Sequence, residues 1–236
     1  MPSLNPAKCK VGDVVLFYEY NLVGVGQGLV KGLKTLTILP AVVSVARGGS
    51  TAFRGAANAN HAAIITGIEG RRVFSMVHAT NSGVQSVDID TFLLGASGTL
   101  QLFRQKGQFD FAAEAGKVGA TWAMAAEERP GGMPYATSKA FCSVLQGPGF
   151  GSGAKQRAAF YRQSKDRQGG PADLANMRDG RSKAMFCSMF VIACYQAVMS
   201  DMYCEQMLAL DAKHTSPMYL DGYFKNSQHW ERVDGT

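Results

Sequence analysis

The sequence predicts an α+β fold in which an antiparallel β-sheet, open or closed into a barrel, packs against a buried helix that carries a cysteine. Residues 11–20, VGDVVLFYEY, are rich in β-branched and aromatic side chains, as strands are. Residues 61–80 form two apolar runs around a Glu-Gly turn, which predicts a β-hairpin. Residues 187–200 carry no charge and are apolar nearly all round, which indicates a buried helix.

The remaining elements follow in order along the chain. Residues 24–49 predict a helix broken near Pro40, because proline interrupts the helical hydrogen bonds. Residues 98–105 predict a further strand, and the alanine-rich residues 109–128 predict a helix that ends before Pro130. Residues 214–233 predict a turn followed by one short element. We expect a single domain over residues 1–236, since 236 residues suffice for one good core.

The cysteine pattern and the lack of long apolar runs exclude several classes of protein. Five cysteines are an odd number for a disulfide framework, and none are spaced like zinc ligands. We expect no metal and no cofactor. The N-terminus lacks the basic-then-apolar pattern of a signal peptide, and residues 33–46 are too short to span a bilayer. The sequence therefore predicts a soluble protein with no transmembrane segment and no Sec signal.

Positive charge is concentrated in residues 150–183, which hold eight Lys or Arg against three Asp, in a chain of net charge +6. Such a segment is either a solvated loop or a surface that attracts an anionic partner. Aromatic residues do not alternate with the basic ones, so we expect no nucleic-acid binding. The glycines at positions 24, 26 and 28 do not complete a dinucleotide fingerprint.

The predicted hairpin brings two of the four histidines together. If residues 69 and 70 form the loop, His61 lies directly opposite His78. Facing side chains on one sheet face have Cβ atoms about 4.5–5.5 Å apart. A loop one residue longer would instead place His61 opposite Ala79.

Cys187 begins the buried helix, where free N–H groups and the helix dipole stabilise a thiolate and a developing oxyanion. A histidine must accept the thiol proton and a third polar group must orient that histidine, and the hairpin supplies both. The alternative is an inert core cysteine, which is the commoner role for a cysteine in an apolar helix. Cys142 is a rival nucleophile, whereas Cys194 and Cys204 are expected to be core residues.

Six motifs occur in an order that resembles a known enzyme family. They are VGDVVLF, NHAAIITG, VFSMVHAT, LQLFR, MFCSMFVIACYQ and TSPMYL. This order is similar to that of the circularly permuted NlpC-type cysteine peptidases, papain-like enzymes in which the histidine strands precede the cysteine helix. The resemblance implies a permuted papain-like fold. It is weak at about residues 21–60 and 150–183, which look like insertions.

The resemblance also implies roles for individual residues. Cys187 matches the nucleophile, His61 the general base and His78 the residue that orients the base, although the match of His78 is to the unpermuted branch. Asp13 matches a position that is expected to fix the start of the first strand. Substrate-binding positions are expected at Tyr135, Asn60 and Ser188.

The activity implied is hydrolysis of amide bonds through a thioester, most simply in the peptide stems of bacterial peptidoglycan. A basic enzyme of this kind without a Sec signal would be cytoplasmic in the producing cell and exported by a specialised secretion system. It would then be an antibacterial effector, with a secretion carrier or an immunity protein as partners. Two alternatives stay open: acyl chemistry on lipid or protein substrates at the same site, and a non-catalytic binding module with a degenerate site.

Overall fold

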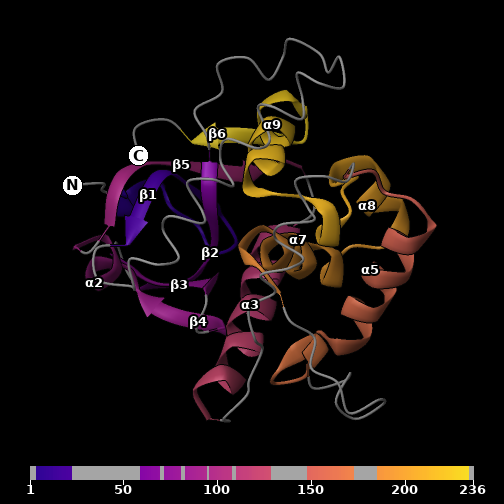
Figure 1. Cartoon of the computed structure of the whole chain (residues 1–236), viewed down its shortest axis with the longest axis horizontal. Helices are drawn as coiled ribbons and strands as arrows, with labels where there is room; N and C mark the ends of the chain where they lie inside the picture. Colours follow the sequence, from indigo (N-terminus) through magenta and orange to yellow (C-terminus); the bar gives the residue numbers. More distant parts are fainter. Residues whose placement is uncertain are drawn as a thin grey trace.

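A computed structural model of the chain describes residues 4–22, 59–69, 72–80, 83–94, 96–107, 110–128, 148–172 and 185–233. Within these ranges the protein is mixed α and β, as expected, and is built around one antiparallel sheet of strand order β4-β3-β2-β1-β5-β6 (Figure 1). The strands are β1 Val14–Leu22, β2 Ala59–Glu69, β3 Arg72–Thr80, β4 Gly83–Asp88, β5 Ala96–Gln105 and β6 Trp230–Val233. The α-helices are α2 Ile89–Leu94, α3 Phe111–Glu128, α5 Ser152–Ser164, α7 Cys187–Val198, α8 Asp201–Met207 and α9 Pro217–Asn226. Short 3-10 helices are η1 Pro6–Lys8 and η3 Ala212–His214.

Successive side chains of each strand point to opposite faces of the sheet, and the two faces bury different clusters. Leu16 and Ala62 face the larger cluster, which the helices α3, α7 and α9 complete. Phe17 and Ala63 face the smaller cluster, which includes Phe92 of α2. Figure 1 shows α7 between the sheet and α5, so α7 is enclosed on both sides. This position explains why α7 is apolar nearly all round.

A buried ion pair fixes the start of β1. The carboxylate of Asp13 accepts hydrogen bonds from the Arg104 side chain at 2.9 and 2.7 Å and from the Lys10 backbone N–H at 2.7 Å. Asp13 is fully buried, so these donors replace the water that it loses. The expected structural role of Asp13 is confirmed.

The β2–β3 hairpin forms, but its predicted register is wrong. The ladder pairs Glu69 with Arg72 and Ala63 with His78, so that His78 is not directly opposite His61. The shift from the expected pairing is two residues. Because side chains alternate with a period of two, a shift by two keeps every side chain on its expected face.

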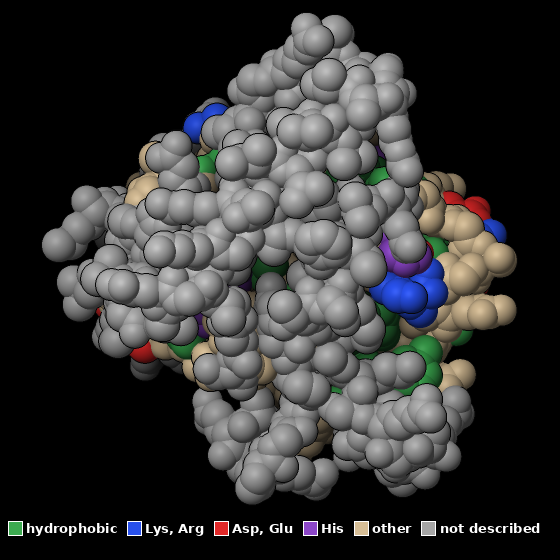
Figure 2. Space-filling model, viewed as in Figure 1, with side chains coloured by type: hydrophobic (Ala, Val, Ile, Leu, Met, Phe, Trp, Pro, Cys, Tyr) green, Lys and Arg blue, Asp and Glu red, His purple; other side chains and the backbone are tan. Residues whose placement is uncertain are grey.

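The expectation of a solvated basic loop is wrong for residues 152–164, which form α5. Acidic residues outside this helix pair with three of its basic side chains: Lys155 with Glu205, Arg157 with Asp211, and Arg162 with Asp201. Figure 2 shows basic side chains and an imidazole together over the region of α5. Acidic residues in α8 and at the start of η3 therefore neutralise these three basic side chains within the chain.

The C-terminal region contains more structure than expected. Residues 214–233 contain both α9 and β6, rather than one short element. The N-terminus of α9 is capped by Ser216, whose hydroxyl accepts the Tyr219 N–H. The predicted broken helix near Pro40 lies outside the described residues. In the described part of the chain no helix is long and apolar enough to cross a membrane.

Candidate active site

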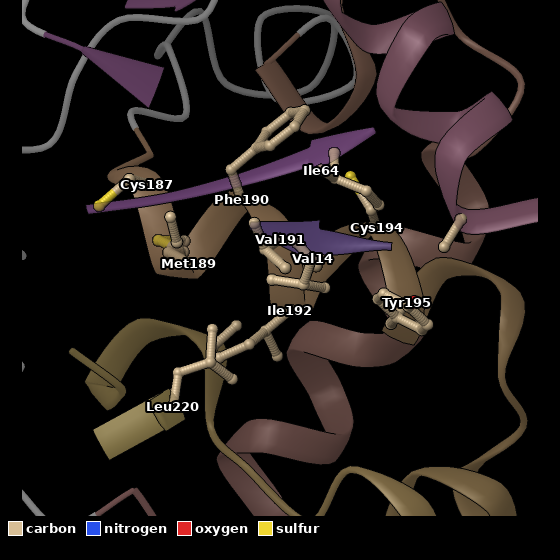
Figure 3. Close-up of a cluster of buried hydrophobic side chains, with 14 of the residues drawn as sticks. Val14, Ile64, Cys187, Met189, Phe190, Val191, Ile192, Cys194, Tyr195 and Leu220 are labelled. Carbon is tan, nitrogen blue, oxygen red and sulfur yellow. The ribbon is translucent and has the colours of Figure 1, made fainter. Parts of the chain in front are cut away.

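Cys187 is the first residue of α7, as predicted. Phe186 occupies the N-cap position and offers no capping side chain, so the N–H groups of the first turn need other partners. Figure 3 shows Cys187 at the end of the helix and pointing away from the centre of the cluster, while Cys194 lies within it near Ile64. The backbone N–H groups of Ala62, Ser188 and Cys187 itself lower the pKa of the thiol and so favour its thiolate.

The sulfur is nevertheless hard to ionise. Cys187 is 3% exposed, and burial raises the pKa of its thiol to about 11 against the opposite effect of the three N–H groups. The expected stabilisation by helix N–H groups is therefore present, yet desolvation outweighs it. At neutral pH this cysteine is a thiol and not a thiolate.

The two hairpin histidines form a direct pair. His61 Nε2 lies 2.9 Å from His78 Nδ1, and the rings meet edge to face with centroids 5.0 Å apart. Phe17 contacts the His61 ring, and Phe92 contacts the His78 ring at 4.9 Å. Burial, and then the charge of His78, hold the pKa of His61 well below its usual range, and burial lowers the pKa of His78 to about 4. Both imidazoles are neutral at neutral pH.

The Cys187 sulfur and the imidazole pair are associated with consecutive residues of β2, Ala62 and His61. The backbone N–H of Ala62 lowers the pKa of the Cys187 thiol, and the Ala62 side chain lies in the larger cluster with Cys187. The ring of His61 contacts Phe17, a member of the smaller cluster on the opposite face. The β2–β3 pairing begins at Ala63 and His78, one residue beyond this point. The Cys187 sulfur and the His61 ring are therefore associated with neighbouring residues of β2 on opposite faces of the sheet.

The hydrogen bond between the histidines can form in two tautomeric arrangements, with either ring as the donor. If His61 donates its Nε2 proton to His78, then Nδ1 of His61 is the nitrogen that can accept a proton. His78 accepts on Nδ1 in this arrangement and carries its own proton on Nε2. A neutral base held in one tautomer is what a cysteine or serine nucleophile requires.

The other predicted positions are placed as follows. Ser188 is fully buried, and its hydroxyl donates to the Thr215 carbonyl at 2.7 Å. Asn60 is half-buried in β2, next to His61. Cys194 and Cys204 are fully buried, and burial raises the pKa of both thiols, as expected of core cysteines. Tyr135 and Cys142 lie outside the described residues.

Sequence reasoning missed the residues that support the start of α7 from the C-terminal region. Thr215 receives the Ser188 hydrogen bond, and Leu220 of α9 packs in the same cluster as Cys187 (Figure 3). The Ser-Pro pair at 216–217 is a helix-start signal and could have predicted α9. No local pattern indicates that the carbonyl before it accepts a bond from α7.

Among the residues that the structure describes, no group of three or more His, Cys, Asp or Glu is arranged to hold a metal ion. Comparisons with protein-family models, with curated proteins and with solved structures find no match to this chain. Membership of the permuted NlpC-type family thus stays a prediction.

Proposed function

We propose that the protein is a cysteine-dependent hydrolase that cleaves amide bonds through a thioester intermediate. The observation that carries the proposal is the pair of His61 and His78, whose ring nitrogens lie 2.9 Å apart next to Ala62, whose backbone N–H lowers the pKa of the Cys187 thiol. In this proposal α7 supplies the nucleophile, β2 the base and β3 the group that orients the base.

In the proposed reaction, the thiol proton of Cys187 passes to Nδ1 of His61 while the sulfur bonds to the substrate carbonyl carbon. Backbone N–H groups at the start of α7 stabilise the resulting oxyanion. The tetrahedral intermediate collapses, the amide C–N bond breaks, and His61 returns the proton to the leaving amine. Water then attacks the thioester with His61 as base, and this releases the acid and the free thiol.

The buried environment favours a neutral starting pair over a thiolate–imidazolium pair. Burial raises the pKa of Cys187 and lowers that of His61, so both changes oppose charge separation before substrate binds. We therefore propose that proton transfer accompanies attack on the carbonyl, as it does for serine nucleophiles. Since Cys187 is 3% exposed, neighbouring parts of the chain must move to admit a substrate.

We propose the peptide stem of peptidoglycan as the substrate, a choice that rests on the sequence resemblance. Purified protein is incubated with peptidoglycan, and released fragments are identified by mass spectrometry. Cys187→Ala should abolish release, whereas Cys194→Ala, a matched change in the same helix, should retain it. If neither the wild type nor Cys187→Ala releases fragments, peptidoglycan is rejected as the substrate. An exported antibacterial effector remains the matching biological proposal.

A second substrate class has one observation in its favour. Cys187 belongs to a buried apolar cluster that also includes Met189 and Leu220. A site opened among such residues would suit a fatty-acyl group better than a charged peptide stem. Hydrolysis of an acyl ester by the wild type, with no release of fragments from peptidoglycan, would favour lipid or protein acyl substrates.

A further inference from the structure

We propose that Ser188 is a positioning residue: its buried hydrogen bond to Thr215 holds the first-turn N–H groups of α7 in place around the Cys187 sulfur. The inference rests on the proposed function and concerns regulation of reactivity at the same site. Ser188 acts through the backbone, because its side chain donates to Thr215 and the residue directly follows Cys187 in the first turn of α7.

The geometry of the bond is favourable. Ser188 Oγ donates to the Thr215 carbonyl at 2.7 Å, and both residues are fully buried. A buried hydroxyl that loses its partner has no water to replace it, so this bond is costly to break. It joins two segments that are 27 residues apart in the sequence.

Thr215 is itself held from the other side. Its hydroxyl donates to the Asp211 carbonyl at 2.7 Å, which closes the turn formed by η3. The Asp211 carboxylate pairs with Arg157 of α5 and with His214, and it accepts the Lys213 N–H at 3.1 Å. The Asp211 N–H donates in turn to the Pro148 carbonyl at 2.7 Å.

These contacts form a continuous path from α5 to the residue that follows the nucleophile. The path is needed because the N-cap residue Phe186 has no side-chain bond to the first turn. In helices with a Ser, Thr, Asp or Asn cap, that side chain fixes the first turn. In α7 the hydrogen bond from Ser188 to Thr215 holds the first turn instead. The first-turn N–H groups are therefore left available to the sulfur.

The test measures the rate at which iodoacetamide alkylates Cys187 at several pH values, read by mass spectrometry of the Cys187 peptide in the full chain. If Ser188→Ala misorients the N–H groups, the thiolate loses stabilisation and its pKa rises. A rise of one pH unit lowers the rate about tenfold below the pKa. Thr215→Val, which removes the bond to Asp211 but keeps the accepting carbonyl, should slow the reaction less, in the same direction.

Ser200→Ala is the matched control. Ser200 caps α8 at the far end of α7, so its loss weakens the fold without touching the Cys187 sulfur. Alkylation in this variant should match the wild type. Thermal unfolding confirms that each variant is folded. If Ser188→Ala does not fold, Thr215→Val alone tests the inference.

Two results would overturn the inference. If Ser188 merely holds the helix in the core, its loss exposes the sulfur and makes alkylation faster, not slower. An unchanged rate and pH profile would also refute the positioning role. Neither result bears on the proposed function, which is judged by substrate release. Conversely, if the wild type cleaves no substrate while Ser188→Ala still slows alkylation, the positioning role of Ser188 would stand and the proposed hydrolase function would fail.

Discussion

His61 and His78 join through ring nitrogens 2.9 Å apart, although Ala63 and not His61 stands directly across the ladder from His78. The contact is diagonal, between residues on the same face of neighbouring strands. Long or ring-shaped side chains reach such diagonal neighbours, which lie about 7–8 Å apart at Cα. The pairing of the histidines therefore survives a register different from the one that the turn residues predict.

His78 should matter through its bond to His61. In His78→Phe the imidazole of His61 loses its acceptor, and its tautomer is no longer fixed. We expect kcat to fall about 100-fold, with KM little changed. His78→Asn, whose side-chain oxygen can accept the same proton, should lose less. Steady-state kinetics on the cleaved substrate measures both, and equal activity in all three proteins would show that His78 has no role in orienting the base.

Stability should fall in mild acid because of the same pair. Burial lowers the pKa of His78 from 6.5 to about 4, so between these values the unfolded chain binds more protons than the folded one. Stability then rises with pH through this window and is lost as pH falls from about 6.5 to about 4. The loss from His78 is about 3 kcal/mol at pH 4. Urea unfolding at several pH values measures it.

His78→Phe should show a weaker dependence of unfolding free energy on pH over this window than the wild type. His229→Gln leaves the buried pair intact and should keep the full dependence. If the wild type and His78→Phe lose stability in parallel, the titrating groups lie elsewhere.

The ion pair at the start of β1 should be worth far more than the pairs on the surface. Asp13→Asn leaves Arg104 without its buried counter-charge, and we expect a loss of about 3 kcal/mol. The matched change Asp201→Asn removes the partly exposed pair with Arg162 and should cost about 0.5 kcal/mol. Denaturant unfolding compares the two, and equal losses would contradict the assigned role of Asp13.

Gly12 should tolerate no side chain. Its φ is +89°, and a Cβ added there would lie 1.9 Å from the Ala112 carbonyl oxygen at the start of α3. Gly12→Ala should therefore destabilise the fold by more than about 3 kcal/mol or prevent folding. Gly151→Ala is the control, because a Cβ there meets nothing within 4 Å. Melting temperatures of the two variants report the difference.

Several features followed from local patterns in the sequence. Alternating and β-branched residues predicted β1, the hairpin and β5, and the uncharged stretch after residue 186 predicted α7 with Cys187 at its start. These signals are local because a strand or a helix buries one face or all faces, and its composition records that burial. The meeting of His61 and His78 was also predicted, from a direct pairing that the observed register replaces by a diagonal one on the same face.

The tertiary structure decided the properties that depend on distant residues. The sign of the Cys187 pKa shift depends on how completely α3, α5 and the sheet remove water around α7, and no local pattern reports that. The charges of Arg157 and Arg162 looked free in sequence but are matched by Asp211 and Asp201 across the fold. Segments that are far apart in the chain set both effects, because desolvation and ion pairing depend on distance in space rather than on separation along the sequence.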